Sequence, residues 1–322
     1  MKESPLFWPL TLKNQTIYCL DETALPDKLV YLKAKNLKQA LALIKTMKTR
    51  AFGQVLMAYL IFLLLLKKNT PAPAEKIMPI LQKAADKINA ARPTFPFAFF
   101  TKMVLGWAKE GVKTGEPLAG YVASKISHFL AFLREKRLAQ ARTLSALLKD
   151  GDIVLTHCNV SGLLVSAAQV CREQNKKIKF IVTETRPYLQ GARLTAWELQ
   201  RAGFDVTIIP DSAVAFALSR KAATVVVVGA DQMAQNGDIA NKIGTYQIAL
   251  LAREFKIPFY VLTPPPSAAK TGNDIKIEIR PERELLEIYG RRIAPRGAKA
   301  LYPAFDITPR ELISRYIALE LR

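Results

Sequence analysis

Cysteine and histidine are scarce in this chain of 322 residues, which contains three cysteines and two histidines. The cysteines are Cys19, Cys158 and Cys171, and no pair has the C-x-x-C spacing. This excludes a disulfide scaffold and a structural zinc site of the usual kind, and it fits a protein of the reducing cytoplasm. Two histidines also leave little material for a His-based metal centre. We therefore expect no metal.

The chain also lacks an apolar run long enough to cross a bilayer. Its longest run, Val55–Leu66, falls short of the roughly 18 apolar residues that a spanning helix needs. The first ten residues, MKESPLFWPL, lack the apolar core of a signal peptide. The run therefore predicts a buried helix, and we expect no membrane partner.

Acidic residues are few: 27 Asp and Glu stand against 47 Lys and Arg, which gives a formal net charge of +20. Such a charge fits a nucleic-acid surface, a binder of anionic metabolites or a feature of general solubility. The basic residues are scattered through segments such as LREKRLAQAR (133–142), and no aromatic-glycine signature of RNA binding is present. Nucleic acid is therefore not expected as the main partner.

The pattern of apolar and polar residues changes near residue 145. Residues 1–145 predict a mainly helical domain with short strands at its start, whereas residues 146–322 alternate short apolar runs with helical stretches. This alternation predicts an α/β fold with a parallel sheet covered by helices on both faces. Ligands bind such sheets at the carboxyl ends of the strands. The predicted strands are 153–156, 179–183, 206–209, 224–228 and 258–262.

Cys158 follows the first of these strands, within Thr156-His157-Cys158-Asn159, and precedes a predicted helix. At a helix N-terminus the dipole stabilises a thiolate and lowers the pKa of the thiol. Cys158 is therefore a candidate reactive thiol. The alternative is a small buried residue of the core.

A dense polar segment, 183–193, follows the second strand. Arg186 and Arg193 carry guanidinium groups suited to a phosphate or carboxylate, although a structural ion pair is an equal alternative. Gly191 would let backbone N–H groups approach an anion closely.

Asp231 follows the fourth strand and is a candidate general acid or base, with an N-cap of the next helix as the alternative. Asn241 and Lys242 are expected to open the following helix, where a lysine and neighbouring amides would bind an anion. Neither G-x-G-x-x-G nor a Walker A motif occurs, so a dinucleotide or ATP is not indicated.

Two of these segments carry a resemblance. ETRPYLQGARLTAWEL (184–199) and GADQMAQNGDIANKIGTYQIALLA (229–252) resemble the methylthioribose-1-phosphate isomerase family, and the similarity runs from about Tyr18 to PAFDITPRELI (303–313). That family is related to ribose-1,5-bisphosphate isomerases and to the alpha, beta and delta subunits of the eukaryotic initiation-factor exchange complex. The resemblance implies a helical N-terminal domain, a Rossmann-like C-terminal domain and a homodimer.

The resemblance also implies an activity, the interconversion of an aldose 1-phosphate and a ketose 1-phosphate, with no cofactor. It assigns catalysis to Cys158 and Asp231. Substrate binding is assigned to Gln190, Asn241 and Lys242, to the Arg92 of an Arg-Pro-Thr element, and to the loop that begins Arg50-Ala51-Phe52.

Two segments depart from the family pattern. Arg-Gly-Ala-Pro reads here as Arg50-Ala51-Phe52-Gly53, and the glycine after Cys158-Asn159 comes one position late, at Gly162. The substrate is accordingly open between a 5-methylthio sugar, ribose 1,5-bisphosphate and 5-deoxyribose 1-phosphate. A non-catalytic protein that binds a sugar phosphate or nucleotide is the alternative from another class.

Overall fold

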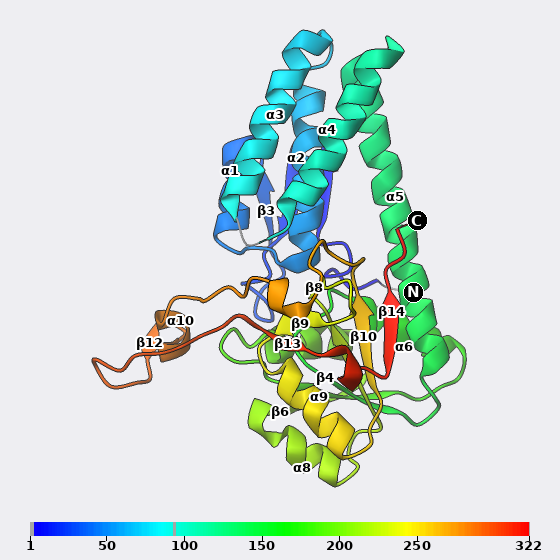
Figure 1. The fold of residues 1–322 in the computed structure, drawn as a ribbon, viewed down its shortest axis with the longest axis vertical. Helices are drawn as coiled ribbons and strands as arrows, with labels where there is room; N and C mark the ends of the chain where they lie inside the picture. Colours follow the sequence, from blue (N-terminus) through cyan, green and yellow to red (C-terminus); the bar gives the residue numbers. More distant parts are fainter. Residues whose placement is uncertain (1–2, 93–94, 322) are drawn as a thin grey trace. The chain divides into compact units, whose positions relative to one another are not determined.

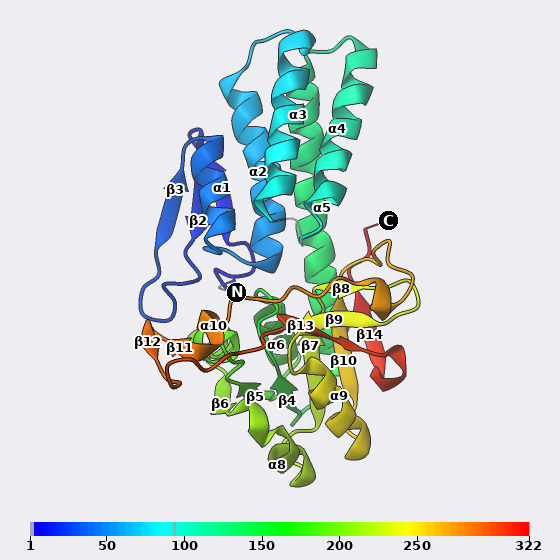
Figure 2. The same ribbon diagram turned by 60° about the vertical axis from the view of Figure 1, so that its left-hand side comes forward.

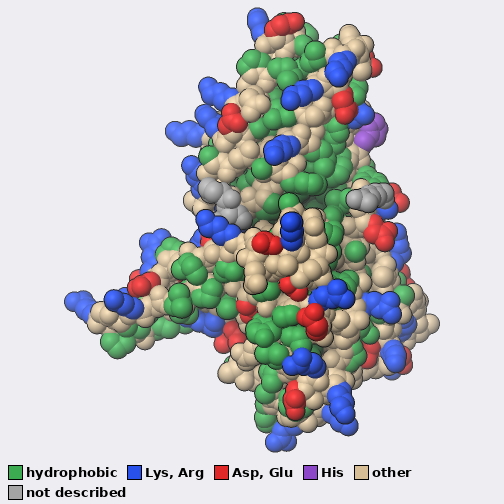
Figure 3. All heavy atoms as spheres, viewed as in Figure 1, with side chains coloured by type: hydrophobic (Ala, Val, Ile, Leu, Met, Phe, Trp, Pro, Cys, Tyr) green, Lys and Arg blue, Asp and Glu red, His purple; other side chains and the backbone are tan. Residues whose placement is uncertain are grey.

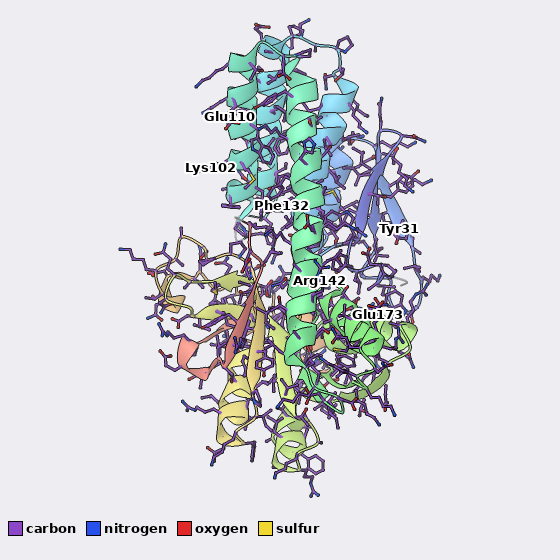
Figure 4. All side chains as sticks on the ribbon, turned by 90° about the vertical axis from the view of Figure 1, so that its right-hand side faces the viewer. Tyr31, Lys102, Glu110, Phe132, Arg142 and Glu173 are labelled. Atoms are coloured by element: carbon purple, nitrogen blue, oxygen red, sulfur yellow. The ribbon has the colours of Figure 1, made fainter. Side chains whose placement is uncertain are left out.

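A computed structural model describes residues 3–92 and 95–321. The chain divides into two compact units, one formed by Pro5–Glu135 and the other by Met1–Ser4 with Lys136–Arg322. The division falls within one long helix, α5, which spans Leu118–Leu147. In Figure 4 this helix faces the viewer and carries Phe132 and Arg142. The boundary predicted between residues 145 and 146 stays a prediction.

The N-terminal unit combines a small antiparallel sheet with a set of helices that pack side by side (Figure 2). The strands pair in the order β1-β2-β3. Helix α2 packs against α3 and α4, and these two also pack against each other. The elements are β1 (Leu10–Lys13), β2 (Thr16–Leu20), β3 (Tyr31–Ala34), α1 (Leu37–Lys45), α2 (Ala51–Lys68), α3 (Ala74–Ala91) and α4 (Phe97–Thr114).

Helix α2 contains the apolar run that the sequence predicted to be a buried helix, and this prediction is confirmed. Among the described residues it is the one helix long and apolar enough to span a bilayer, and 67% of its residues are buried inside the structure. The side chains of Tyr59, Phe62 and Leu64 are fully buried in the unit's hydrophobic core. Burial on nearly all sides explains why this helix needs no polar face.

The C-terminal unit contains a six-stranded parallel sheet in the order β14-β10-β7-β4-β5-β6 (Figure 1). The predicted α/β fold with a Rossmann-like sheet is confirmed. The chain runs β4, β5, β6 to one side and then returns to β7, so the direction of winding switches between β4 and β7. The strands are β4 (Ile153–Thr156), β5 (Lys179–Thr183), β6 (Asp205–Ile209), β7 (Val225–Gly229), β10 (Phe259–Thr263) and β14 (Arg315–Ala318).

Helices cover both faces of this sheet. Val226 and Val228 pack with α8 and α9 in one cluster, while Val225 and Val227, which point to the opposite face, are buried as well. A strand buried on both faces explains the unbroken valine run. The helices are α6 (Leu163–Glu173, whose last residue is labelled in Figure 4), α7 (Ala196–Arg201), α8 (Val214–Ser219) and α9 (Thr245–Glu254).

Two smaller elements complete the unit. An antiparallel sheet pairs β13 (Phe305–Thr308), β9 (Ile239–Lys242) and β8 (Gln232–Met233). An arm projects from the same unit and carries α10 (Arg283–Leu286) and the hairpin of β11 (Glu287–Ile288) and β12 (Arg291–Arg292) (Figure 1). Figure 3 shows the Lys and Arg side chains spread over the visible face, with no single basic patch there.

Candidate active site

The candidate site lies at the carboxyl ends of three neighbouring strands, β7, β4 and β5. Cys158 comes two residues after β4 ends, and Asp231 comes two residues after β7 ends. Their loops touch, because a β-carbon added to Gly229 would lie 2.9 Å from Val160 Cγ1. The structure thus brings the candidate thiol and the candidate carboxylate to the same edge of the sheet, at the switch point where such folds bind ligands.

Cys158 has a left-handed backbone, with φ 64°, and is half-buried. Its N–H donates to Thr185 Oγ1 at 2.9 Å, and its carbonyl accepts from Thr195 Oγ1 at 2.5 Å. The helix that follows, α6, begins only at Leu163. The prediction that Cys158 lies at a helix N-terminus is therefore wrong, because three non-helical residues and a left-handed Gly162 intervene.

Asp231 has an exposed side chain and a backbone fixed by β9, since its N–H donates to Ala240 O at 2.9 Å. Strand β8 begins at the next residue, so Asp231 is not the N-cap of a helix. The register of β8 and β9 pairs Gln232 with Ala240, which places Asp231 beside Asn241.

Asn241 and Lys242 end strand β9, and the prediction that they open a helix is wrong. They pair with Asp306 and Phe305 of β13, and helix α9 begins only at Thr245. Asn241 Nδ2 donates to Thr245 Oγ1 at 2.9 Å. A strand partner some 60 residues further along the chain explains why local sequence gave no sign of this pairing.

The ammonium group of Lys242 lies among aromatic rings. Its Nζ is 5.1 Å from the ring centroid of Phe305 and 5.7 Å from that of Tyr302, and 3.4 Å from the Tyr302 hydroxyl. Burial raises the pKa of Tyr302, and the charges of Tyr188, Glu284 and Cys158 raise it further. Tyr302 is therefore a neutral phenol within electrostatic range of both Lys242 and Cys158.

The N-terminus of α9 already has an anion, the carboxylate of Asp306. Its two oxygens accept from Gly244 N at 2.7 Å and from Tyr246 N at 3.1 Å. Burial raises the pKa of Asp306 to about 6, although these bonds and the charge of Lys242 oppose the rise. The expected anion seat at this helix is thus filled by the protein itself.

His157 connects three parts of the site. Its Nδ1 lies 2.6 Å from Thr183 Oγ1, and its Nε2 lies 2.9 Å from the carbonyl oxygen of Ile243. The carbonyl can only accept, so Nε2 carries the proton and Nδ1 accepts from the threonine. Burial lowers the pKa of His157, with partial opposition from Asp211. A neutral His157 therefore links the end of β4 to the segment that follows Lys242.

Gln190 precedes a π-helical turn, η1 (Gly191–Thr195), which continues into α7. A β-carbon on Gly191 would overlap the carbonyl oxygen of Thr183, so this glycine allows the turn to pack against β5 rather than to admit an anion. Gln190 is 5% exposed, and its Oε1 is buried without a hydrogen-bond partner among residues 3–92 and 95–321. Such an acceptor fits a ligand hydroxyl.

The two arginines of this segment have partners within the protein. Arg186 donates to the carbonyl oxygens of Pro187 and Leu285. The guanidinium of Arg193 stacks 5.9 Å from the ring centroid of Tyr289. These contacts are with backbone carbonyls and an aromatic ring, so neither the phosphate fork nor the structural ion pair is tested by them, and both stay predictions.

The remaining predicted site residues lie in the N-terminal unit. Arg50 N donates to Glu22 Oε1 at 3.0 Å, and Ala51 has a left-handed φ of 35° where helix α2 begins. The Phe52 ring lies 5.4 Å from that of Trp8. Arg92 Nη1 donates to Gln54 Oε1 at 3.2 Å, while Pro93 and Thr94 lie outside the described residues. Arg50 thus directly precedes α2 and Arg92 contacts Gln54 of the same helix, in a different unit from Cys158 and Asp231.

Within the part of the chain that the structure describes, no group of three His, Cys, Asp or Glu side chains could hold a metal ion. Sequence reasoning did not single out His157, Tyr302 or Asp306. The signal that could have drawn attention to Asp306 was the PAFDITP segment, whose polar residue lies between apolar ones at strand spacing.

The fold and the site together define a Rossmann-like α/β protein with a thiol and a carboxylate at its switch point. The chain belongs to the initiation factor 2 subunit family, whose model matches residues 53–319. The chain is 37% identical to the methylthioribose-1-phosphate isomerase of Desulforudis audaxviator, a match that covers 98% of this chain and 93% of that one. It is 38% identical to the enzyme of the same name from Thermosipho africanus, over 92% of this chain and 89% of that one.

Two solved structures are also similar. The 5-methylthioribose 1-phosphate isomerase of Pyrococcus horikoshii has a TM-score of 0.86 and 29% identity, over 97% of this chain and 91% of that chain. The translation initiation factor eIF-2B subunit delta of A. fulgidus has a TM-score of 0.82 and 32% identity, over 97% and 94%.

Proposed function

We propose that the chain is an aldose-ketose isomerase that converts 5-methylthioribose 1-phosphate into the corresponding ribulose 1-phosphate. The observation that carries this proposal is the match, over nearly the full length, to relatives with that name. The site adds chemical support, because Cys158 and Asp231 reach the same edge of the sheet from neighbouring strands.

The chemistry requires two proton-transfer groups. The 1-phosphate blocks the anomeric oxygen, so the sugar ring cannot open to a free aldehyde. A proton must reach the ring oxygen as its bond to C1 breaks. C2 then loses its hydrogen, C1 gains one, and the C2 hydroxyl loses its proton as the ketone forms. The hydrogens gained at the ring oxygen and C1 equal those lost from C2 and its hydroxyl, so no external oxidant or reductant is consumed.

We assign these transfers to Asp231 and Cys158. Asp231 would act as the acid and base at the ring oxygen and the C2 hydroxyl, and Cys158 would act at C2 or stabilise the migrating charge. A positioned acid-base group contributes about 10²–10⁴-fold to the rate. Asn241 and Gln190, whose buried Oε1 has no hydrogen-bond partner among the described residues, would bind sugar hydroxyls, and Lys242 would bind the phosphate.

The resemblance further assigns substrate contacts to Arg50, Ala51, Phe52 and Arg92, and we retain them as proposals. A homodimer and a cytoplasmic location belong to the same proposal. Sedimentation equilibrium of the purified chain tests the homodimer, and a monomer at micromolar concentration would contradict this state.

The test is a phosphorus and proton NMR assay with 5-methylthioribose 1-phosphate, ribose 1,5-bisphosphate and 5-deoxyribose 1-phosphate. We expect conversion of the methylthio sugar, with kcat lower by at least 100-fold in Cys158→Ser and in Asp231→Asn. Cys171→Ser is the matched control, because Cys171 is buried against Ser145 away from the site. Native rates in both site variants would contradict the assignment.

One observation favours a second function. The similarity to an initiation-factor subunit, at 32% identity, fits a protein that binds a sugar phosphate or nucleotide without converting it. Binding of the panel sugars without conversion by the wild-type chain would establish this alternative and overturn the first proposal.

A further inference from the structure

Behind Cys158 lies a set of buried polar side chains that the proposed chemistry does not use. A left-handed backbone is unfavourable for a non-glycine residue and persists only where its surroundings impose it. Cys158, at φ 64°, is such a residue, and Ser161, at φ 50°, is a second one in the same loop. The question is what holds this loop in place.

Both peptide groups of Cys158 are held by threonine hydroxyls from other elements. Thr185 Oγ1 accepts from the Cys158 N–H, and Thr195 Oγ1 donates to the Cys158 carbonyl. The Thr195 hydroxyl has a single proton, which this bond uses, so its remaining capacity is to accept. It accepts from Asn159 Nδ2 at 2.9 Å.

The Asn159 amide is fully satisfied in this arrangement. Its Nδ2 donates to Thr195 Oγ1 and, at 2.8 Å, to Glu198 Oε1, while its Oδ1 accepts from Ser161 N at 2.8 Å. Thr195 and Glu198 are three residues apart on the continuous helical segment of η1 and α7, so they present their oxygens on the same side.

Glu198 is the last member of the set and is 2% exposed. Its second oxygen accepts from the Ser4 hydroxyl at 2.6 Å. Arg137 is buried nearby and donates to Ser161 O at 2.7 Å, and the Glu198 charge supports its guanidinium against the effect of burial, which lowers its pKa to about 9. A buried carboxylate with this many partners is costly to disturb.

We infer that Glu198 is a positioning residue for the thiol: through Asn159 and Thr195 it fixes the left-handed backbone of Cys158. The inference rests on the proposed function only in taking Cys158 as the reacting thiol. The Glu198 carboxylate accepts hydrogen bonds from Ser4 and from Asn159. The donors then follow one order, in which the Asn159 amide donates to Thr195 Oγ1 and the Thr195 hydroxyl donates to the Cys158 carbonyl.

The first test compares Thr195→Val with Thr195→Ser, which differ in the hydroxyl. We expect Val to lower kcat at least tenfold with KM within twofold, and Ser to stay within threefold of wild type. Release of the loop should also raise the iodoacetamide alkylation rate of Cys158 at least threefold at pH 9, measured by mass spectrometry of each cysteine. Equal alkylation and equal kcat in the two variants would overturn the inference.

Cys19 and Cys171 provide an internal control, since both are buried with no exposed surface. If a variant merely unfolds, all three cysteines gain label together, which also contradicts a specific positioning role. The alkylation readout needs no turnover, so it tests the inference even if the chain isomerises no sugar.

The second test exchanges the partners. Asn159→Asp places a carboxylate against Glu198 and should lower kcat at least 30-fold with faster labelling of Cys158. The double variant Asn159→Asp with Glu198→Gln restores the acid-amide contact between these two positions in the reverse order, but the Asp at 159 has no proton to donate to Thr195 Oγ1, so we expect it to recover about threefold of that loss. Additive losses in the double variant would show that the two residues act independently and would overturn the inference.

Discussion

Val160 lies against the α-carbon of Gly229, so closely that a β-carbon there would be 2.9 Å from Val160 Cγ1. This contact joins the loop of Cys158 to the strand that leads to Asp231. The Gly229 backbone does not require glycine for its φ, since it is not left-handed. Glycine is therefore required at this position for a steric reason, because a side chain would collide with Val160.

Gly229→Ala should push the two loops apart and lower kcat at least tenfold, because displacements of about 1 Å can cost about 100-fold in rate. The double variant Gly229→Ala with Val160→Ala removes the clash and should recover most of the loss. Steady-state kinetics of the four proteins, wild type included, measure this coupling. If the double variant is as slow as Gly229→Ala alone, the contact does not set the loop position.

Lys242 offers a test of substrate binding. Lys242→Met keeps an apolar side chain between the rings of Tyr302 and Phe305 but removes the charge. A charge-assisted hydrogen bond is worth about 1.5–3 kcal/mol, so KM for the sugar phosphate should rise about 10- to 100-fold with kcat little changed. Lys242→Arg is the control that keeps the charge. An unchanged KM in the Met variant would remove Lys242 from the phosphate site.

Asp306 predicts a loss of stability with rising pH. Burial raises its pKa from 3.8 to about 6, so the folded state holds the proton more tightly than the unfolded state does. The free energy of unfolding therefore falls as pH rises from about 4 to about 6, by up to about 3 kcal/mol. Asp306→Asn should gain stability relative to wild type across this range, as measured by urea unfolding. Asp274→Asn, at an exposed cap, is the control, and a pH-independent difference for Asp306→Asn would contradict the prediction.

His157 predicts a pH dependence of stability opposite to that of Asp306. Burial lowers its pKa from 6.5, so protonation favours the unfolded state, and stability falls as pH drops below about 6.5. His157→Gln, which keeps a donor for Ile243 O, should show a smaller drop in urea midpoint than wild type between pH 7.5 and 5.5. His128→Gln is the control, since this second histidine is exposed. An equal drop in urea midpoint in wild type, His157→Gln and His128→Gln would show that His157 does not cause this pH dependence.

The parallel sheet could be predicted from the sequence almost strand by strand. The run at 153–156 became β4 and the run at 179–183 became β5 with unchanged bounds, the run at 206–209 gained one residue as β6, and the other two shifted by one residue. Buried β-branched runs between helical segments carry a strong local signal. Strand β14 was missed because Arg315 and Tyr316 break its apolar character.

The site was less predictable because it depends on distant pairing. Nothing near Asn241 indicates that Asp306 and Phe305 lie beside β9, and the helical pattern that begins at Thr245 drew the preceding residues into the predicted helix. Likewise the left-handed Gly162 delays α6 beyond Cys158. The family resemblance identified the candidate site residues in the sequence. Their backbone conformations depend on contacts between distant segments, which only the folded chain shows.

The register of β9 also bears on how related sequences can vary in length. Strand β9 is pinned on both edges, by β8 and by β13, and it ends in Asn241 and Lys242. A single inserted residue there would swap which of the two side chains faces each side of the sheet. The hairpin turn at Tyr289-Gly290 joins only the two short strands β11 and β12, and Tyr289 is 78% exposed although its ring contacts the Arg193 guanidinium. Insertions and deletions should therefore accumulate at that turn and be purged between Gln232 and Lys242.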